Sequence, residues 1–224
     1  MEFPIPVPPS RKLSGEQGWG EVRVRLTNTG KRFNREWIFR HFNAELVSGK
    51  SYAITGANGS GKSTLLQVIA GSLTYNEGNI QYAVGNVQYP DDEQFKHISI
   101  AAPYLELIEE MSANEILSFH RSFKSLLMDN EEILAWVQLQ ETAKKQIRYY
   151  SSGMKQRLKL AMAFFSATPV LLLDEPTTNL DANGIALYHQ LIGEFTKDRL
   201  VIISSNDRQE YDFCDEMIAM ENYK

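Results

Sequence analysis

A phosphate-binding loop at residues 56–63 constrains this chain more than any other feature of its sequence. The segment reads Gly-Ala-Asn-Gly-Ser-Gly-Lys-Ser, which is a complete G-x-x-x-x-G-K-[ST] pattern. It follows the apolar run at 52–54 and opens a stretch of helical character at 64–70. A strand that passes through such a loop into a helix is typical of an α/β nucleotide-binding core. The sequence therefore predicts that fold and the binding of a nucleotide.

The residue types of the loop match the groups of a bound phosphate chain. Glycines allow backbone N–H groups to close around the β-phosphate, and the helix start adds about half a positive charge. Lys62 is expected to reach the β- and γ-phosphate oxygens, and the Ser63 hydroxyl is expected to ligate Mg²⁺. The nucleotide-binding residues predicted here are Gly56, Asn58, Gly59, Ser60, Gly61, Lys62, Ser63 and Thr64.

Length and composition narrow the class of protein further. The 224 residues, 43% of them hydrophobic, fit one α/β domain with a packed core. A net charge of -5 argues against a general nucleic-acid surface, so we expect no nucleic-acid partner. The longest apolar runs, at 160–165 and 170–173, are far shorter than the roughly 20 residues that cross a bilayer. We expect that this chain does not span a membrane by itself.

The N-terminal part of the chain divides into a tail and a β-layer. Residues 1–19 are proline-rich, lack the features of a signal peptide, and are predicted to form an extended, flexible tail. Val22, Val24 and Leu26 alternate with polar residues, which predicts a half-buried antiparallel strand. Apolar residues between 39 and 46 suggest another strand. An antiparallel β-layer is therefore expected before the nucleotide core, which continues as a mostly parallel sheet.

A helical segment interrupts the core. From 104 to 139 the sequence has helical character, with a capping box at 112–115. Ile116, Phe119, Phe123 and Leu127 follow at helical spacing, which indicates a helix. A second helical stretch covers 131–139. We expect a helical lobe at about 100–160, inserted in the nucleotide-binding core.

Two further segments carry candidate chemistry. The apolar run at 169–173 closes on Asp174 and Glu175, as a central buried strand does where it meets a ligand crevice. Asp174 is expected to hold Mg²⁺, and Glu175 to orient and polarise the water that attacks the γ-phosphorus. The alternative is a solvated turn. Ser151 and Gly153 open another helix and could meet phosphate oxygens, although the pattern alone indicates only an N-cap.

The order of these segments resembles the ATP-binding subunits of ABC transporters. The resemblance rests on the phosphate loop, the helical lobe, Tyr-Ser-Ser-Gly-Met-Lys-Gln-Arg at 150–157, Leu-Leu-Leu-Asp-Glu-Pro at 171–176, and Thr-Asn-Leu-Asp at 178–181. It runs from about residue 21 to the C-terminus, so 20–224 would form one ABC ATPase domain. The resemblance implies ATP and Mg²⁺ as ligands and ATP hydrolysis that powers a membrane transporter.

The family resemblance also implies a dimer. Two subunits, identical or paralogous, would sandwich ATP head to tail, so that Ser151 and Gly153 contact the γ-phosphate bound by the other copy. Asp181 would belong to the same nucleotide-binding set. Phe33 matches the aromatic residue that stacks on adenine in the family. Trp37 is the alternative stacker, and Phe33 could instead be an ordinary core aromatic.

The sequence departs from the family pattern at three places. Asn206 stands where histidine is usual, and an amide cannot carry a proton or a positive charge. Pro103, or Tyr104 if the register slips by one, replaces a glutamine that touches Mg²⁺. Ser152 and Met154 replace glycine and glutamine in the signature segment. Asn206 could contribute to catalysis as a donor, but hydrolysis is expected to be slow.

The resemblance implies a separate transmembrane permease that docks on the lobe around 100–125, and therefore a cytoplasmic, membrane-peripheral location. Two alternatives remain open. The chain could be an ATP-binding dimerisation module with little or no hydrolysis. It could also be a soluble mechanical ATPase of the same superfamily, although the long heptads or tandem cassettes usual there are absent.

Overall fold

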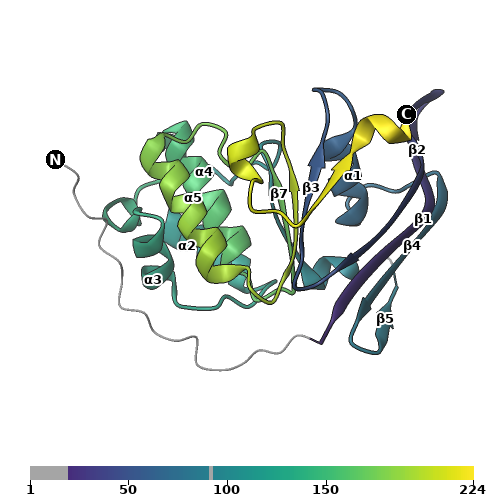
Figure 1. Cartoon of the computed structure of the whole chain (residues 1–224). Helices are drawn as coiled ribbons and strands as arrows, with labels where there is room; N and C mark the ends of the chain where they lie inside the picture. Colours follow the sequence, from purple (N-terminus) through teal and green to yellow (C-terminus); the bar gives the residue numbers. More distant parts are fainter. Residues whose placement is uncertain (1–19, 91–92) are drawn as a thin grey trace.

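The computed structural model describes residues 20–90 and 93–224, and the predicted tail at 1–19 lies outside the described residues. Two sheets and a group of helices make up the described part of the chain (Figure 1). The antiparallel sheet lies at one side and the helices α2 to α5 at the other, with the parallel sheet between them. This arrangement confirms the predicted α/β class.

The first sheet is antiparallel, in the order β2-β1-β4-β5. Its strands are β1 (Val22–Phe33), β2 (Glu36–Val47), β4 (Glu77–Val84) and β5 (Val87–Tyr89). The first residues of β1 alternate between buried and exposed, with Val22, Val24 and Leu26 buried. The predicted antiparallel β-layer is therefore confirmed, and its period of two explains which face packs against the core.

The second sheet is parallel and carries the phosphate loop. Its order is β6-β7-β8-β3-β9. The strands are β3 (Ser51–Thr55), β6 (Ile98–Ala101), β7 (Val170–Asp174), β8 (Leu200–Ser204) and β9 (Glu216–Ala219). All five residues of β7 are buried, and parallel neighbours lie on both sides of it. The apolar run before Asp174 is thus the interior strand that its composition predicts.

Helices connect the strands and cover the parallel sheet. The α-helices are α1 (Lys62–Ile69), α2 (Ala113–Arg121), α3 (Asn130–Trp136), α4 (Ser152–Phe164) and α5 (Ala182–Phe195). The 3-10 turns are η1 (Gln94–His97), η2 (Gln140–Thr142), η3 (Ile147–Tyr149), η4 (Arg208–Glu210) and η5 (Met220–Tyr223). Helices α2, α3 and α4 all fall between β6 and β7, so the predicted helical insertion is present.

Helical structure starts later than the sequence predicts. Residues 104–111 form turns and irregular backbone, and α2 begins only after its N-cap. Two carbonyls explain this, because Glu109 accepts the N–H of Arg148 and Met111 accepts the N–H of Ile147. A backbone group committed to a distant partner is not available for a helical hydrogen bond. The capping box at Ser112 then sets the start of α2, as predicted.

The helix also ends earlier than this spacing predicts. Ile116 is buried, but Phe119 is 46% exposed and Phe123 is 71% exposed. The helix ends at Arg121, so Phe123 lies beyond it, and the two aromatic rings pack edge to face on the surface. Helical spacing alone could not show that the helix stops before the periodicity does.

Two apolar cores lie on opposite faces of the parallel sheet. Leu171 and Leu173 of β7 pack with the helices, whereas Val170 and Leu172 pack with α1 and the antiparallel sheet. The alternation follows from the strand geometry, since successive side chains point to opposite faces. The carboxyl end of β7 is thereby fixed from both sides, and the residues that follow it occupy defined positions.

Candidate active site

An open cleft of ≈ 400 Å³ lies at the carboxyl ends of the parallel strands. It joins the phosphate loop with a carboxylate that follows β7. Its lining comprises Ile38, Asn58, Gly59, Gly61, Lys62, Ser63, Thr64 and Glu175. Two segments far apart in the sequence, both predicted to carry chemistry, therefore face one cavity. Ile38 of β2 is the lining residue that the sequence did not point to.

The phosphate loop adopts a conformation that requires its glycines. Gly56 has φ of 140° and Gly61 has φ of 103°, in a region that other residues rarely adopt. A Cβ at Gly61 would lie 2.7 Å from Cγ2 of Ile38, so β2 approaches the loop too closely for any side chain there. The glycine pattern thus reflects both backbone conformation and close packing.

The side chains of Lys62 and Ser60 place polar groups in the buried part of the loop. The Lys62 ammonium donates to the carbonyl oxygens of Gly56 at 2.7 Å and Ala57 at 3.3 Å. The Ser60 hydroxyl is buried and has no hydrogen-bond partner among the described residues. Buried polar groups without partners are uncommon, so this hydroxyl is available to a ligand that enters the loop.

Asp174 has the properties expected of a cation ligand. It is 2% exposed, and its Oδ1 is buried without a hydrogen-bond partner in the part of the chain that the structure describes. A buried carboxylate oxygen of this kind is stabilised by a cation or by a water bound to one. Mg²⁺ prefers oxygen ligands and keeps several waters, and the Ser63 hydroxyl in the cleft is a second such oxygen. The donor set therefore fits Mg²⁺.

Glu175 has a strained backbone next to the cleft. Its φ is 42°, a left-handed conformation that is uncommon for residues other than glycine. The conformation is held by its N–H, which donates to the carbonyl oxygen of Ser204 at 2.8 Å. Strain of this kind persists where surrounding structure fixes a functional side chain. Here it accompanies a carboxylate that lines the cleft.

A buried carboxylate, which the sequence did not point to, hydrogen-bonds the segment that follows Glu175. Glu210 is 3% exposed and accepts the N–H of Thr177 at 2.7 Å, together with the Thr177 hydroxyl. Burial raises the pKa of Glu210 above its usual value. Glu210 lies 33 residues from Thr177, and no spacing in the sequence signals this contact.

Asn206 reaches the phosphate loop. Its Nδ2 donates to Oδ1 of Asn58 at 2.7 Å, which joins the segment after β8 to the loop before α1. The structure therefore brings two of the predicted site residues into contact. The amide of Asn206 can act as a hydrogen-bond donor here. It cannot act as a proton carrier, because an amide does not titrate.

Tyr104, which follows β6, carries a polar group beside α1. The Tyr104 side chain is hydrogen-bonded to Gln67 of α1. Burial of the hydroxyl and the nearby Asp174 carboxylate raise the pKa of Tyr104 to about 12. The sequence left open whether Pro103 or Tyr104 stands where the family has a glutamine. It gave no sign of the contact between Tyr104 and Gln67.

The second predicted anion site lies at the start of α4. Ser151 is the N-cap and accepts the N–H of Met154 at 3.2 Å, while a Cβ at Gly153 would lie 3.0 Å from the Asn179 carbonyl oxygen. Asp181 caps α5 and pairs with Arg157 at 3.0 Å. Ser151, Gly153 and Asp181 are not among the residues that line the cleft of their own chain.

The two aromatic candidates for stacking differ in their surroundings. Phe33 is 47% exposed, with the Lys31 ammonium 4.9 Å from its ring centre. Trp37 is partly buried, and the guanidinium groups of Arg40 and Arg32 lie 4.3 Å and 5.4 Å from its ring centre. Phe33 is therefore the more accessible ring, although neither residue lines the cleft.

Comparisons with known proteins show the family to which this chain belongs. A family model described as ABC transporter matches residues 39–178. The chain is 28% identical over 202 residues to the ABC transporter ATP-binding protein YybJ of Bacillus subtilis (strain 168), covering 88% of this chain and 91% of that protein. It is 28% identical over 190 residues to the lantibiotic transport ATP-binding protein SrtF of Streptococcus pyogenes, covering 82% and 79%.

A solved structure shares the fold. It is described as an ATP binding subunit of an ABC transporter and superposes with a TM-score of 0.76 at 21% identity, over 88% of this chain and 85% of that chain. The fold and site define an α/β nucleotide-binding domain, and the chain belongs to the ABC transporter family. It is a nucleotide-binding domain of that family, whose members are generally ATPases. Among the described residues, no helix is long and apolar enough to cross a membrane.

Proposed function

We propose that this chain hydrolyses ATP to power a membrane transporter, through closure of a head-to-tail dimer around two ATP molecules. The observation that carries the proposal is the cleft that joins Lys62 and Ser63 with Glu175. Phosphate-binding groups and a candidate base then face the same bound triphosphate. Such a site catalyses phosphoryl transfer to water mainly by positioning and by electrostatic stabilisation.

Each residue has a distinct role in this mechanism. Glu175 orients the attacking water and accepts its proton, while Lys62 moves from the Gly56 and Ala57 carbonyls to the phosphate oxygens. Asn206 donates to a phosphate oxygen from its position beside Asn58. Asp174 and Ser63 would hold Mg²⁺, which supplies neutralisation of charge on the β- and γ-phosphates.

The proposed dimer supplies phosphate contacts that the cleft of a single chain lacks. Ser151 and Gly153 lie at the start of α4, where a helix N-terminus and a serine hydroxyl suit a phosphate oxygen. They do not line the cleft of their own chain, so a second subunit supplies them to this cleft. That subunit is either another copy of this chain or a paralogous ATPase, and Asp181 lies in the same interface segment.

Turnover is proposed to be slow. An asparagine at position 206 cannot exchange a proton with the reacting groups, and a phenol at Tyr104 is a weaker Mg²⁺ ligand than an amide oxygen. Loss of one preorganised contact to a transition state costs roughly 3 kcal/mol, or about a hundredfold in rate. Phe33 is proposed to stack on the adenine ring because it is the more exposed of the two candidate aromatics.

The partner is proposed to be a transmembrane permease subunit that binds the chain at the cytoplasmic membrane face. A groove of ≈ 260 Å³ lies between β6 and the helices, with apolar walls from Ile100, Leu105 and Met162. Lys124 and Lys159 also line the groove, and their ammonium groups donate to backbone carbonyl oxygens. We propose that an apolar side chain from a cytoplasmic segment of the permease enters this groove.

Dimer formation by a hydrolysis-deficient variant tests the proposal. Glu175→Gln is expected to bind ATP with Mg²⁺ and to accumulate as a dimer, because the closed state is no longer released by hydrolysis. Light scattering coupled to size exclusion measures the mass. The double variant Lys62→Ala/Glu175→Gln is the matched control and should stay monomeric.

Three results would contradict parts of this proposal. A strictly monomeric Glu175→Gln protein at high concentration of ATP and Mg²⁺ would remove the dimer mechanism. Unchanged phosphate release by Glu175→Gln would show that this carboxylate is not the base. A wild-type protein that dimerises without measurable phosphate release would instead favour the dimerisation module.

A further inference from the structure

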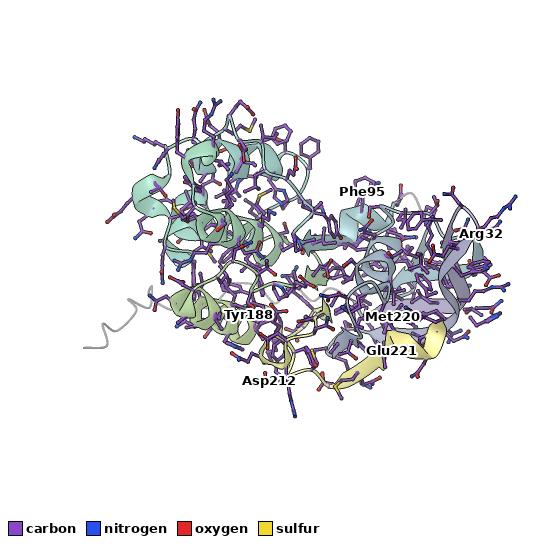
Figure 2. The ribbon with its side chains drawn as sticks, turned by 90° about the horizontal axis from the view of Figure 1, so that it is seen from above. Arg32, Phe95, Tyr188, Asp212, Met220 and Glu221 are labelled. Atoms are coloured by element: carbon purple, nitrogen blue, oxygen red, sulfur yellow. The ribbon has the colours of Figure 1, made fainter. Side chains whose placement is uncertain are left out.

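A C-terminal carboxylate touches the phosphate loop. The N–H of Ala57 donates to Oε1 of Glu221 at 3.0 Å, although 164 residues separate the two. The sheet explains the contact, since β9 runs parallel to β3 with Thr55 opposite Ala219. Both strands leave the sheet at the same edge, so the phosphate loop and η5 emerge side by side. Figure 2 shows Met220 and Glu221 on this C-terminal segment.

The segment that carries Glu221 is anchored at both of its ends. Met220 is fully buried, and its terminal methyl lies 3.5 Å from the position a Cβ would take at Gly61. At the other end, the ring of Tyr223 lies 4.5 Å from that of Phe42 in β2. These contacts hold η5 against the core, so the backbone of Glu221 is fixed beside the loop, while its exposed side chain is held by the bond to Ala57.

Glu221 also packs closely against the first glycine of the loop. A Cβ at Gly56 would lie 2.9 Å from Oε1 and 3.2 Å from Oε2 of Glu221. The backbone N–H groups of Glu221 itself and of Ala57, with help from the nearby Lys62 ammonium, lower the pKa of the carboxyl. The group is therefore an anion at neutral pH.

The same stretch of loop is held by two side chains from different directions. Lys62 donates to the carbonyl oxygens of Gly56 and Ala57, while Glu221 accepts the N–H of Ala57. When Lys62 turns to a phosphate group, its two bonds to the loop are lost. Neither Ala57 nor Glu221 is among the residues that line the cleft, so the bond between them can persist.

We propose that Glu221 is a positioning residue for nucleotide binding, which keeps the phosphate loop in its binding shape when Lys62 moves to the triphosphate. The inference rests on the proposed function of the cleft and adds a C-terminal element to that site. Glu221 acts through the loop backbone and does not touch the nucleotide.

Two effects of this carboxylate on ATP affinity have opposite signs. A hydrogen bond to a charged group stabilises the loop, whereas a negative charge near the triphosphate repels it. Glu221→Ala removes both effects, and Glu221→Gln keeps an acceptor oxygen but removes the charge. Glu221→Asp keeps the charge but shortens the side chain, so that the oxygen no longer reaches Ala57. The three variants therefore separate bond from charge.

Equilibrium ATP binding in the presence of Mg²⁺ tests the proposal on the whole chain. We expect Glu221→Ala and Glu221→Asp to weaken affinity about 5- to 20-fold, and Glu221→Gln to stay within about threefold of the wild type. Asn222→Ala, at an exposed neighbour in the same turn, is the matched control and should bind like the wild type. Thermal unfolding without nucleotide shows that each variant is folded.

The outcomes distinguish this inference from the proposed function. Wild-type affinity in Glu221→Asp and Glu221→Ala would overturn the positioning role, as would tighter binding by both Glu221→Ala and Glu221→Gln. If Glu221→Ala does not fold, the comparison of Glu221→Asp with Glu221→Gln decides alone. Failure of the wild type to bind ATP at all, with Lys62→Ala no weaker, would instead remove the proposed function.

Discussion

Asn206 lies against the phosphate loop through its bond to Asn58, and its side chain lacks a titratable proton. Asn206→His is therefore expected to raise ATP turnover about tenfold or more, because an imidazolium stabilises developing phosphate charge better than an amide. Phosphate release under saturating ATP measures the rate.

The control for Asn206→His is Gln209→His, which adds the same ring at an exposed position in η4. It should leave turnover unchanged. A rate in Asn206→His no higher than in the wild type would mean that the asparagine does not limit hydrolysis.

His120 lines the groove between β6 and the helices, and its titration is expected to make the stability of the protein depend on pH. Its Nε2 lies 2.8 Å from the Ser166 hydroxyl oxygen, and burial, with the nearby Lys124 ammonium, lowers the pKa of His120 to about 4. The unfolded histidine has a pKa of about 6.5, so between these values the unfolded state binds the extra proton. Stability is expected to fall by about 1 to 2 kcal/mol as the pH drops from 6.5 to 4.

Replacement of this histidine tests the titration directly. His120→Gln keeps a donor for Ser166 but has no proton to gain, so the loss of stability across this pH window should shrink. Urea unfolding at several pH values measures it, and an unchanged pH dependence would assign the effect to other groups.

The pairing of β4 with an irregular part of β1 requires a glycine in β4. The register between the strands shifts after Thr27, and Asn28 has φ of 48°. Gly78 faces this bulge with φ of 85°, and a Cβ there would lie 2.3 Å from the Asn28 carbonyl oxygen. Gly78→Ala is therefore expected to cost about 2 kcal/mol or more in the free energy of unfolding.

Gly193 in α5 provides the opposite case for comparison. A Cβ there meets nothing within 4 Å, and alanine is the better helix former. Gly193→Ala should stabilise the protein by up to about 1 kcal/mol. If urea unfolding gave both alanine variants the same stability, the explanation based on the bulge would be wrong.

The sequence predicted the start of α2 correctly, but it did not predict the irregular segment before this helix. The capping box at Ser112 marked the start of α2, because its hydrogen bonds are local. The irregular chain before it depends on bonds from Arg148 and Ile147, which lie far along the chain. Local patterns therefore located helix starts better than they located the segments between them.

A buried arginine ties several elements of the whole molecule together. Arg199 is 2% exposed, and its guanidinium donates to the Phe164 carbonyl oxygen at 2.9 Å and the hydroxyls of Ser99 at 2.8 Å and Thr168 at 3.0 Å. These partners belong to the end of α4, to β6 and to the approach to β7. The side chain thus links the helical insertion to the parallel sheet.

Removal of this guanidinium should destabilise the whole fold. Arg199→Met leaves the buried carbonyl and hydroxyl groups without their donor, at an expected cost of about 3 kcal/mol. Urea unfolding measures the change, with Lys197→Met at an exposed site as the control, expected within about 0.5 kcal/mol of the wild type. A similar stability of both variants would show that the buried network contributes little.

The sequence by itself determined the fold class and the chemistry of the nucleotide loop. Glycines at fixed spacing, Lys62, and an apolar strand that ends at Asp174 act through local backbone geometry and composition, so they can be read without coordinates. Only the tertiary structure decided which distant groups support them. Glu221 meets Ala57, and Asn206 meets Asn58, because parallel strands bring their carboxyl ends to one edge. Contacts of that kind depend on strand order, which no local pattern encodes.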